Sequence, residues 1–275
     1  MEGPHVVGIL ASRVAASLPI PPVLETLTLL LTGFAASFFS ALAGGGAGLL
    51  QFPALVLLGL SFAAAVATHK VAVVALGVGS TARHLREGGI DWRFLGLCTL
   101  LGLPGVVFGT RLAFGIPDHV GNVVFGCVNI GMGLYSIWRP ALGLQAAPRN
   151  REGRGLRWGC LWVFVVGWLT GLVPSGPGVF STLLFLLWFG FDYRQAVAQT
   201  MIMVGLFWNA AGALTAAVAG PVMWAWIPAL VIGGLLGGYL GSHLGLLKGN
   251  RFIKRAYEWL TLLMGASLIA QGLSG

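Results

Sequence analysis

Charged residues are scarce in this sequence. Only 9% of its 275 residues are charged, and 57% are hydrophobic. Soluble domains usually carry about 25% charged residues. So few charges cannot cover a water-exposed surface of this size. The composition therefore excludes an ordinary soluble domain and predicts an integral membrane protein whose surroundings are the lipid bilayer.

Signatures of nucleotide-driven and catalytic chemistry are also missing. The sequence contains no GxxxxGK[ST] phosphate loop and no HExxH, and Ser175 follows Val173-Pro174 rather than standing in a GxSG motif. Cys98, Cys127 and Cys160 lie in apolar runs without a CxxC pair, which is typical of buried small residues rather than metal or redox sites. We therefore expect no enzyme, no cofactor and no metal site.

The net charge of +8 admits two explanations. Basic residues bind nucleic acid, but they also collect in the cytoplasmic loops of membrane proteins. No basic stripe interleaved with aromatic residues occurs here, so we expect no nucleic acid as a partner.

The apolar residues fall into ten segments. Because a membrane-spanning helix needs about 20 residues, they predict an all-α membrane protein, a polytopic helical bundle with eight to ten hydrophobic segments in total. The predicted segments are 24–43, 49–61, 64–82, 94–113, 120–138, 158–173, 178–190, 195–218, 224–246 and 254–273.

One polar stretch divides the chain. We expect an N-terminal surface segment at 1–22, a first transmembrane repeat at 23–139, a cytoplasmic linker at 140–157 and a second repeat at 158–275. The halves match in order and spacing, as in Gly105-x-x-x-Gly109 and Gly237-x-x-x-Gly241, with an offset that drifts only from 131 to 132. The two GxxxG patterns predict helix-packing faces.

Loop charge predicts the orientation of the repeats. The basic loops occupy different places in the two halves, so by the positive-inside rule the repeats face opposite ways. We expect loops 83–93, 139–157, 192–194 and 248–255 in the cytoplasm, both termini outside, and the protein in the cell inner membrane.

Each half contains one short segment after a broken junction, giving short or broken helices at 44–61 and 174–190. Such pairs in inverted halves indicate a transporter binding site, because freed backbone groups must be buried in protein or line a polar cavity. The alternative is that these junctions are tight turns between ordinary spans.

The junctions and the residues near them form the predicted substrate site. Helix N-termini attract anions, Lys70 is a cation within a span, and His69 can also carry a coupling proton. The alternative for Lys70 is that it extends to the outer interface. The predicted substrate-binding residues are Gly44, Gly45, Gly46, Gly48, Gln51, Thr68, His69, Lys70, Ser175, Gly176, Gly178, Ser181, Thr182, Gln199 and Thr200.

These residues resemble the sulfite exporter TauE/SafE family of membrane permeases. The resemblance rests on Gly44-Gly45-Gly46 followed by Pro53, on Gly89-Ile90-Asp91-Trp92-Arg93, and on Gly176-x-Gly178. It implies transport, often outward, of small sulfur-containing anions such as sulfite or the organosulfonate sulfoacetate. The sequence departs from the family pattern at His69-Lys70, where small polar or apolar residues are expected.

The sequence thus predicts a secondary transporter of a small anion that works by alternating access, with its site between the two repeats. The alternative is an anion channel or a membrane subunit of a larger complex. The further candidate partners are a second copy of the chain, in a homodimer, and protons, through coupled transport.

Overall fold

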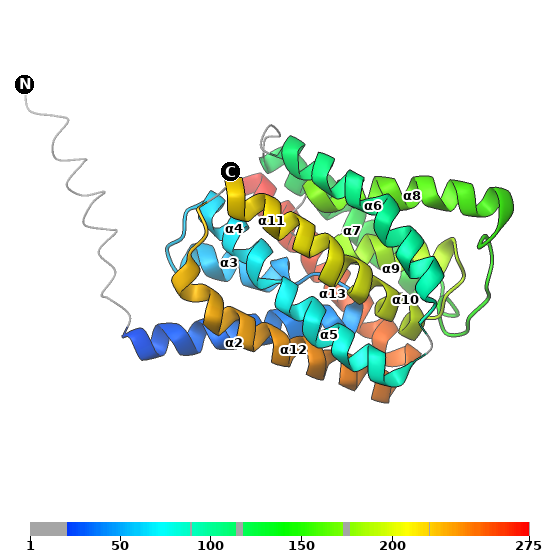
Figure 1. The fold of residues 1–275 in the computed structure, drawn as a ribbon, viewed down its shortest axis with the longest axis horizontal. Coiled ribbons are helices and arrows are strands. Elements are labelled where there is room, and N and C mark those ends of the chain that lie inside the picture. The colour runs from blue at the N-terminus through cyan, green and yellow to red at the C-terminus, as the bar shows by residue number, and fades with distance from the viewer. Residues whose placement is uncertain (1–20, 89, 114–117, 173–176, 220, 275) are drawn as a thin grey trace, which may run out of the picture.

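A computed structural model describes residues 21–88, 90–113, 118–172, 177–219 and 221–274. Every regular element in these residues is a helix, and together they form an elongated bundle (Figure 1). The predicted all-α membrane fold is therefore confirmed.

The first half contains six helices. They are α2 (Pro22–Ala43), α3 (Gly48–Leu57), α4 (Phe62–Ala72), α5 (Val74–Glu87), α6 (Trp92–Ala113) and α7 (Asp118–Trp138). Gly44 ends α2 in a left-handed conformation with φ of 83°, and its N–H donates to the carbonyl of Ser40. Glycine adopts this conformation without a steric penalty.

The second half follows a similar order. It contains α8 (Gly153–Leu172), α9 (Pro177–Leu187), α10 (Tyr193–Thr200), the π-helical η1 (Met201–Trp208), α11 (Asn209–Ala219), η2 (Trp224–Trp226), α12 (Ile227–Lys248) and α13 (Asn250–Ser274). The predicted span 195–218 is thus helical throughout, but its middle is a π-helix, a form that often marks functional sites.

Six helices among the described residues are long and apolar enough to cross a membrane. They are Pro22–Ala43, Ala64–Glu87, Trp92–Thr110, Gly153–Leu172, Tyr193–Val218 and Trp224–Lys248. Each half supplies three. Helices α3 and α9 have only 10 and 11 residues, about 15 to 17 Å at 1.5 Å per residue, so each is about half the length of a crossing.

Two helix starts differ from the prediction. Helix α8 begins at Gly153 rather than at 158, and α13 begins at Asn250 rather than at 254. The apolar pattern alone gave the later starts, because Arg154, Arg157 and Arg251 were taken as loop residues. All three are exposed, and a helix can carry charged side chains in its first turns where it leaves the apolar layer.

Glycine faces hold the long helices together in pairs: α2 with α12, α6 with α8, and α7 with α13. A Cβ atom added at Gly105 would lie 2.5 Å from the carbonyl oxygen of Phe164 in α8. One added at Gly237 would lie 3.0 Å from the backbone nitrogen of Phe38 in α2. Both predicted packing faces are confirmed. All three pairs join a helix of the first half to one of the second. In the first two pairs the halves exchange roles: the first long helix of one half packs against a later long helix of the other.

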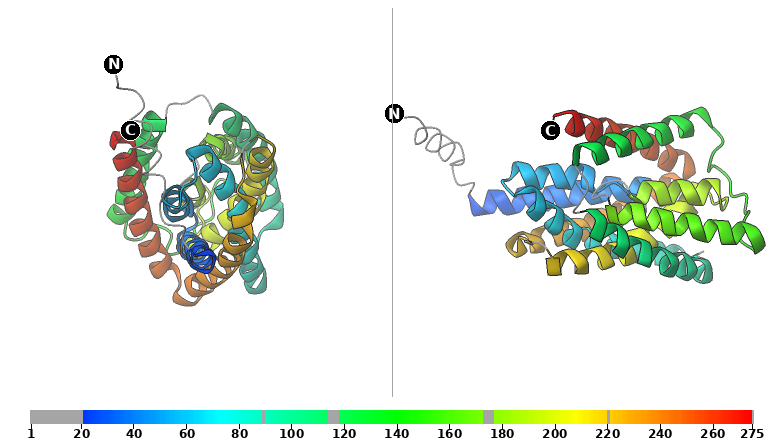
Figure 2. Two further views of the ribbon diagram at one scale, coloured as in Figure 1. Left: turned by 90° about the vertical axis from the view of Figure 1, so that its left-hand side faces the viewer. Right: turned by 90° about the horizontal axis from the view of Figure 1, so that it is seen from above.

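The two ends of the bundle differ. The start of α2 and the end of α13 lie at one end, the terminal end, whereas the linker between α7 and α8 lies at the other, the linker end (Figures 1 and 2). The basic loops meet at the linker end. Asn250 accepts a hydrogen bond from the N–H of Arg194 at 2.9 Å and donates one to the carbonyl of Leu144 at 3.0 Å.

Candidate functional site

The two predicted broken junctions touch each other in the middle of the bundle. Gly44, Gly45 and Gly46 have φ of 83°, 149° and 107°, values that favour glycine. A Cβ atom added at Gly45 would lie 2.6 Å from the Cα of Gly178 and 2.7 Å from the nitrogen of Val179. Segments more than 130 residues apart in the sequence are therefore in backbone contact, which only glycine permits.

A small cavity, here called the central cavity, lies at this contact. Its volume is about 40 Å³. Short helices α3 and α9 both begin at it, and η1 forms another wall. The lining residues are Ser40, Gly45, Gly46, Ala47, Gly48, His69, Val73, Leu76, Gly178, Met201, Val204, Gly205 and Asn209.

Ser40 gives the central cavity an unsatisfied polar group. Ser40 is 1% exposed, and its hydroxyl oxygen has no hydrogen-bond partner among the described residues. Buried hydroxyl groups nearly always have a partner. Helix α3 begins beside it after Ala47, without a side-chain cap, so backbone N–H groups of its first turn lack a capping side chain. The cavity therefore offers hydrogen-bond donors and the positive end of a helix dipole.

Two buried side-chain pairs flank the cavity at matching places in the halves. The Nδ1 of His69 lies 2.8 Å from the Oε1 of Gln51. The hydroxyl of Thr182 donates to that of Thr200 at 3.1 Å and to the carbonyl of Gly44 at 3.2 Å. Adding 131 to 51 and 69 gives 182 and 200, the offset at which the halves match. Gln51 and His69 are thus separated from Thr182 and Thr200 by the same sequence offset.

The remaining predicted residues spread more widely. Thr68 accepts a hydrogen bond from the N–H of Met223 at 2.9 Å, beyond the cavity toward the terminal end. Lys70 lies beside Gly212 of α11, with its Nζ 3.8 Å from a Cβ atom added there. Ser181 is buried in α9, and its hydroxyl has no hydrogen-bond partner in the described ranges. Ser175 and Gly176 lie outside the described residues.

Gln199 lines a second and larger cavity, here called the vestibule. Its volume is about 260 Å³, and it opens toward the linker end between α5 and α10. His84 and Gln199 are both buried, and within the described part of the chain the Nε2 of His84 and the Oε1 of Gln199 lack hydrogen-bond partners. The other lining residues are Glu87, Gly88, Ile90, Asp192, Arg194, Gln195, Ala198 and Leu246.

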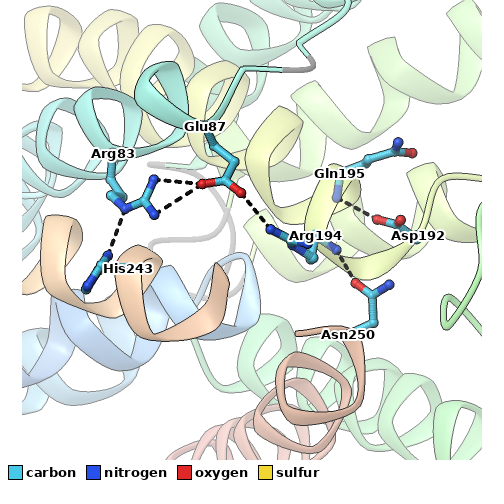
Figure 3. A network of polar contacts seen from close by, with 7 residues as sticks. All are labelled: Arg83, Glu87, Asp192, Arg194, Gln195, His243 and Asn250. Carbon is cyan, nitrogen blue, oxygen red and sulfur yellow. Dashed lines mark hydrogen bonds and ion pairs between the residues drawn. The ribbon is translucent and has the colours of Figure 1, made fainter. Parts of the chain in front are cut away.

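A polar network crosses the rim of the vestibule (Figure 3). Glu87, at the end of α5, pairs with Arg194 at 2.8 Å and with Arg83 at 3.2 Å. The Nε of Arg83 donates to the Nδ1 of His243 at 2.9 Å, and Asp192 caps α10 by accepting from the N–H of Gln195 at 2.8 Å. The network joins α5, α10 and α12, and so ties the two halves together at the linker end.

Sequence reasoning missed several lining residues. Ser40 and Asn209 line the central cavity, and His84 lines the vestibule. The Nδ2 of Asn209 donates to the carbonyl of Gly205, one turn earlier in the same continuous helix. The one available signal was position: Ser40 lies four residues before the triple glycine, on the turn that leads into the break.

The fold and these cavities define a polytopic helical membrane protein with a small polar site at a pair of broken helices, which is the class of membrane transporters. Residues 29–268 match the family described as Sulfite exporter TauE/SafE. This match covers most of the chain, so the chain belongs to that family. The predicted resemblance is confirmed.

Relatives with this architecture carry corresponding names. The chain is 29% identical over 234 residues to "Probable membrane transporter protein YfcA" of Escherichia coli strain K12, covering 85% of this chain and 86% of the relative. It is 26% identical over 241 residues to a "Probable membrane transporter protein" of Haemophilus influenzae, covering 88% and 93%. No solved structure gives a significant match.

Proposed function

We propose that this membrane transporter exports a small sulfur oxyanion, sulfite in the first place, by alternating access at the central cavity. The family name supports sulfite as the substrate class. The observation that carries the proposal is Ser40, which lines a cavity at the starts of two short helices and whose buried hydroxyl has no partner in the described protein. An oxyanion would accept hydrogen bonds from this hydroxyl and from the helix N-termini.

The size of the central cavity favours sulfite over larger organosulfonates. One water needs about 10 to 15 Å³ on this measure of volume, so 40 Å³ holds about three waters or a group of similar size. Sulfite is close to that size, whereas sulfoacetate has twice as many non-hydrogen atoms. Sulfoacetate would require the cavity to expand.

The position of the site between two inverted repeats is part of the proposal. Two observations support it. Helix pairs α2–α12 and α6–α8 exchange the roles of the halves, and the Gln51–His69 and Thr182–Thr200 pairs occupy matching places. A two-fold axis through the central cavity would produce both. We assign the linker end to the cytoplasmic side of the cell inner membrane, because the basic loops gather there.

Two basic residues at or near the site, His69 and Lys70, support an anionic substrate. His69 lines the central cavity. Lys70 is its neighbour in the chain, but its amine lies beside Gly212 of α11. We propose that Lys70 raises the electrostatic potential of the cavity from a distance, since a charge within the bundle is weakly screened.

Ser40→Ala tests the proposal. Because a hydrogen bond to a charged group is worth about 1.5 to 3 kcal/mol, sulfite should bind roughly 10- to 100-fold more weakly. The melting temperature without ligand should stay the same or rise slightly, since the variant removes a buried hydroxyl without a partner. Binding is measured under anaerobic conditions by equilibrium dialysis, with sulfate, thiosulfate, sulfoacetate and taurine as comparison ligands.

Thr170→Val is the matched control. The Thr170 hydroxyl is also buried in a long helix, but it donates to the carbonyl of Val166 at 2.7 Å, away from the cavity. Sulfite binding by this variant should equal that of the wild type. If Ser40→Ala binds sulfite as tightly as the wild type, the central cavity is not the sulfite site. If none of the anions raises the melting temperature of the wild type, the proposed substrate class is wrong.

A further inference from the structure

We propose that the vestibule is the route by which an anion reaches the central cavity from the linker end, and that the Glu87–Arg194 ion pair is its gate. The inference rests on the transport function proposed above. It assigns a role to residues that do not touch the central cavity.

The vestibule and the central cavity lie in line along the same two helical walls. On α5, Leu76 lines the central cavity and His84 lines the vestibule. These residues are eight positions apart, which is about 12 Å along a helix axis. On the opposite wall, Gln199 lines the vestibule and Met201 lines the central cavity. The two cavities therefore share α5 and the continuous α10–η1 helix as walls.

The vestibule is built for a polar solute. His84 and Gln199 line this space, and the buried Nε2 of His84 and Oε1 of Gln199 have no partner among the described residues. Buried polar atoms without partners are costly. Water or a passing oxyanion can provide those partners, and a volume of about 260 Å³ gives room for an anion together with part of its hydration shell.

The corresponding place at the terminal end is closed. Thr68 is the position that matches Gln199 at the offset of 131. Its hydroxyl oxygen is buried and accepts a hydrogen bond from the N–H of Met223 at 2.9 Å. Thr68 is thus covered by a loop at the terminal end, whereas its counterpart Gln199 lines a cavity at the linker end. A carrier that alternates between two sides requires such a difference between its ends.

The Glu87–Arg194 pair has the properties of a gate at the vestibule rim. It joins α5 of the first half to α10 of the second, and its side chains are 41% and 40% exposed. Exposed ion pairs contribute little stability and are screened by salt, so this pair can open at small cost. The Lys254–Glu258 pair, by contrast, lies within α13, and its side chains are only 9% and 14% exposed.

Cysteine labelling tests the gate without any substrate. Gln199→Cys is introduced after Cys98, Cys127 and Cys160 are replaced, and a hydrophilic maleimide is added to the purified protein in detergent. Position 199 should react, and adding Glu87→Gln or Arg194→Gln should raise its rate by about two- to fivefold, the range expected for loss of an exposed pair. Melting temperatures check that each variant is folded.

Two controls sharpen the result. Arg86→Gln removes a neighbouring exposed charge, which hydrogen-bonds Tyr239, and should leave the rate at position 199 unchanged. Thr68→Cys places the thiol at the closed end. It should react more slowly than the thiol at position 199, and adding Glu87→Gln should leave its labelling rate unchanged.

A thiol at position 199 that never reacts, or reacts equally with and without Glu87, would overturn the vestibule and its gate. Because this readout involves no anion, that failure is separate from a failure of the wild type to bind sulfite.

Discussion

Gly45→Val should abolish transport and lower the apparent melting temperature by roughly 5 to 15 °C. A side chain at position 45 meets the backbone of Gly178 at 2.6 Å and Val179 at 2.7 Å, where nothing flexible can move away. Overpacking costs about 1 to 3 kcal/mol, and a β-branched residue at φ of 149° adds backbone strain of about 1 to 3 kcal/mol. Thermal unfolding and sulfite uptake into proteoliposomes measure the two effects.

Gly59→Val separates strain from contact. Gly59 also has a positive φ, 101°, but a Cβ atom added there has nothing within 4 Å. This variant should show only the strain part of the destabilisation and should retain transport. Equal losses in Gly45→Val and Gly59→Val would mean that the contact between the two broken junctions contributes nothing.

Lys254→Met should destabilise the linker end by about 3 to 5 kcal/mol, because it leaves a partly buried carboxylate without its partner. The Lys254 ammonium pairs with Glu258 at 2.7 Å and donates to the Ser136 hydroxyl at 2.9 Å and to the carbonyl of Arg139 at 3.2 Å. It therefore ties α13 to the end of α7. The expected result is a melting temperature lower by roughly 10 °C or more.

The double variant Lys254→Met with Glu258→Leu is the matched control. Replacing both partners of a buried pair by apolar residues is often close to neutral, so much of the loss should be recovered. If the double variant is as unstable as Lys254→Met, the destabilisation comes from the lost contacts to Ser136 and Arg139 rather than from the isolated charge.

Much of the fold could be predicted from the sequence because a membrane restricts the alternatives. Backbone groups in lipid must be satisfied within helices, so each apolar run becomes a helix, as α2 and α12 do. Gly105-x-x-x-Gly109 and Gly237-x-x-x-Gly241 could be assigned to packing faces for the same reason, since close helix contacts need small residues. The triple glycine at 44–46 stood out as a break, and two of its residues, Gly45 and Gly46, line the central cavity.

Other features depend on three-dimensional neighbours that the sequence does not display. Buried hydroxyls in helices often bond back one turn, as Thr110 does to the carbonyl of Val106 at 2.8 Å. Nothing in the local sequence distinguishes Ser40, whose hydroxyl makes no such bond. The π-helix at Met201–Trp208 is likewise unmarked, because its residues are as apolar as those of an ordinary span.

The direct test of the anion site is anomalous diffraction from crystals soaked in selenite, a heavier analogue of sulfite. Selenium should give a peak in the central cavity, within hydrogen-bonding distance of the Ser40 hydroxyl and beside the starts of α3 and α9, and the peak should be lost in Ser40→Ala. A selenium peak elsewhere in the bundle with the central cavity empty would contradict the account.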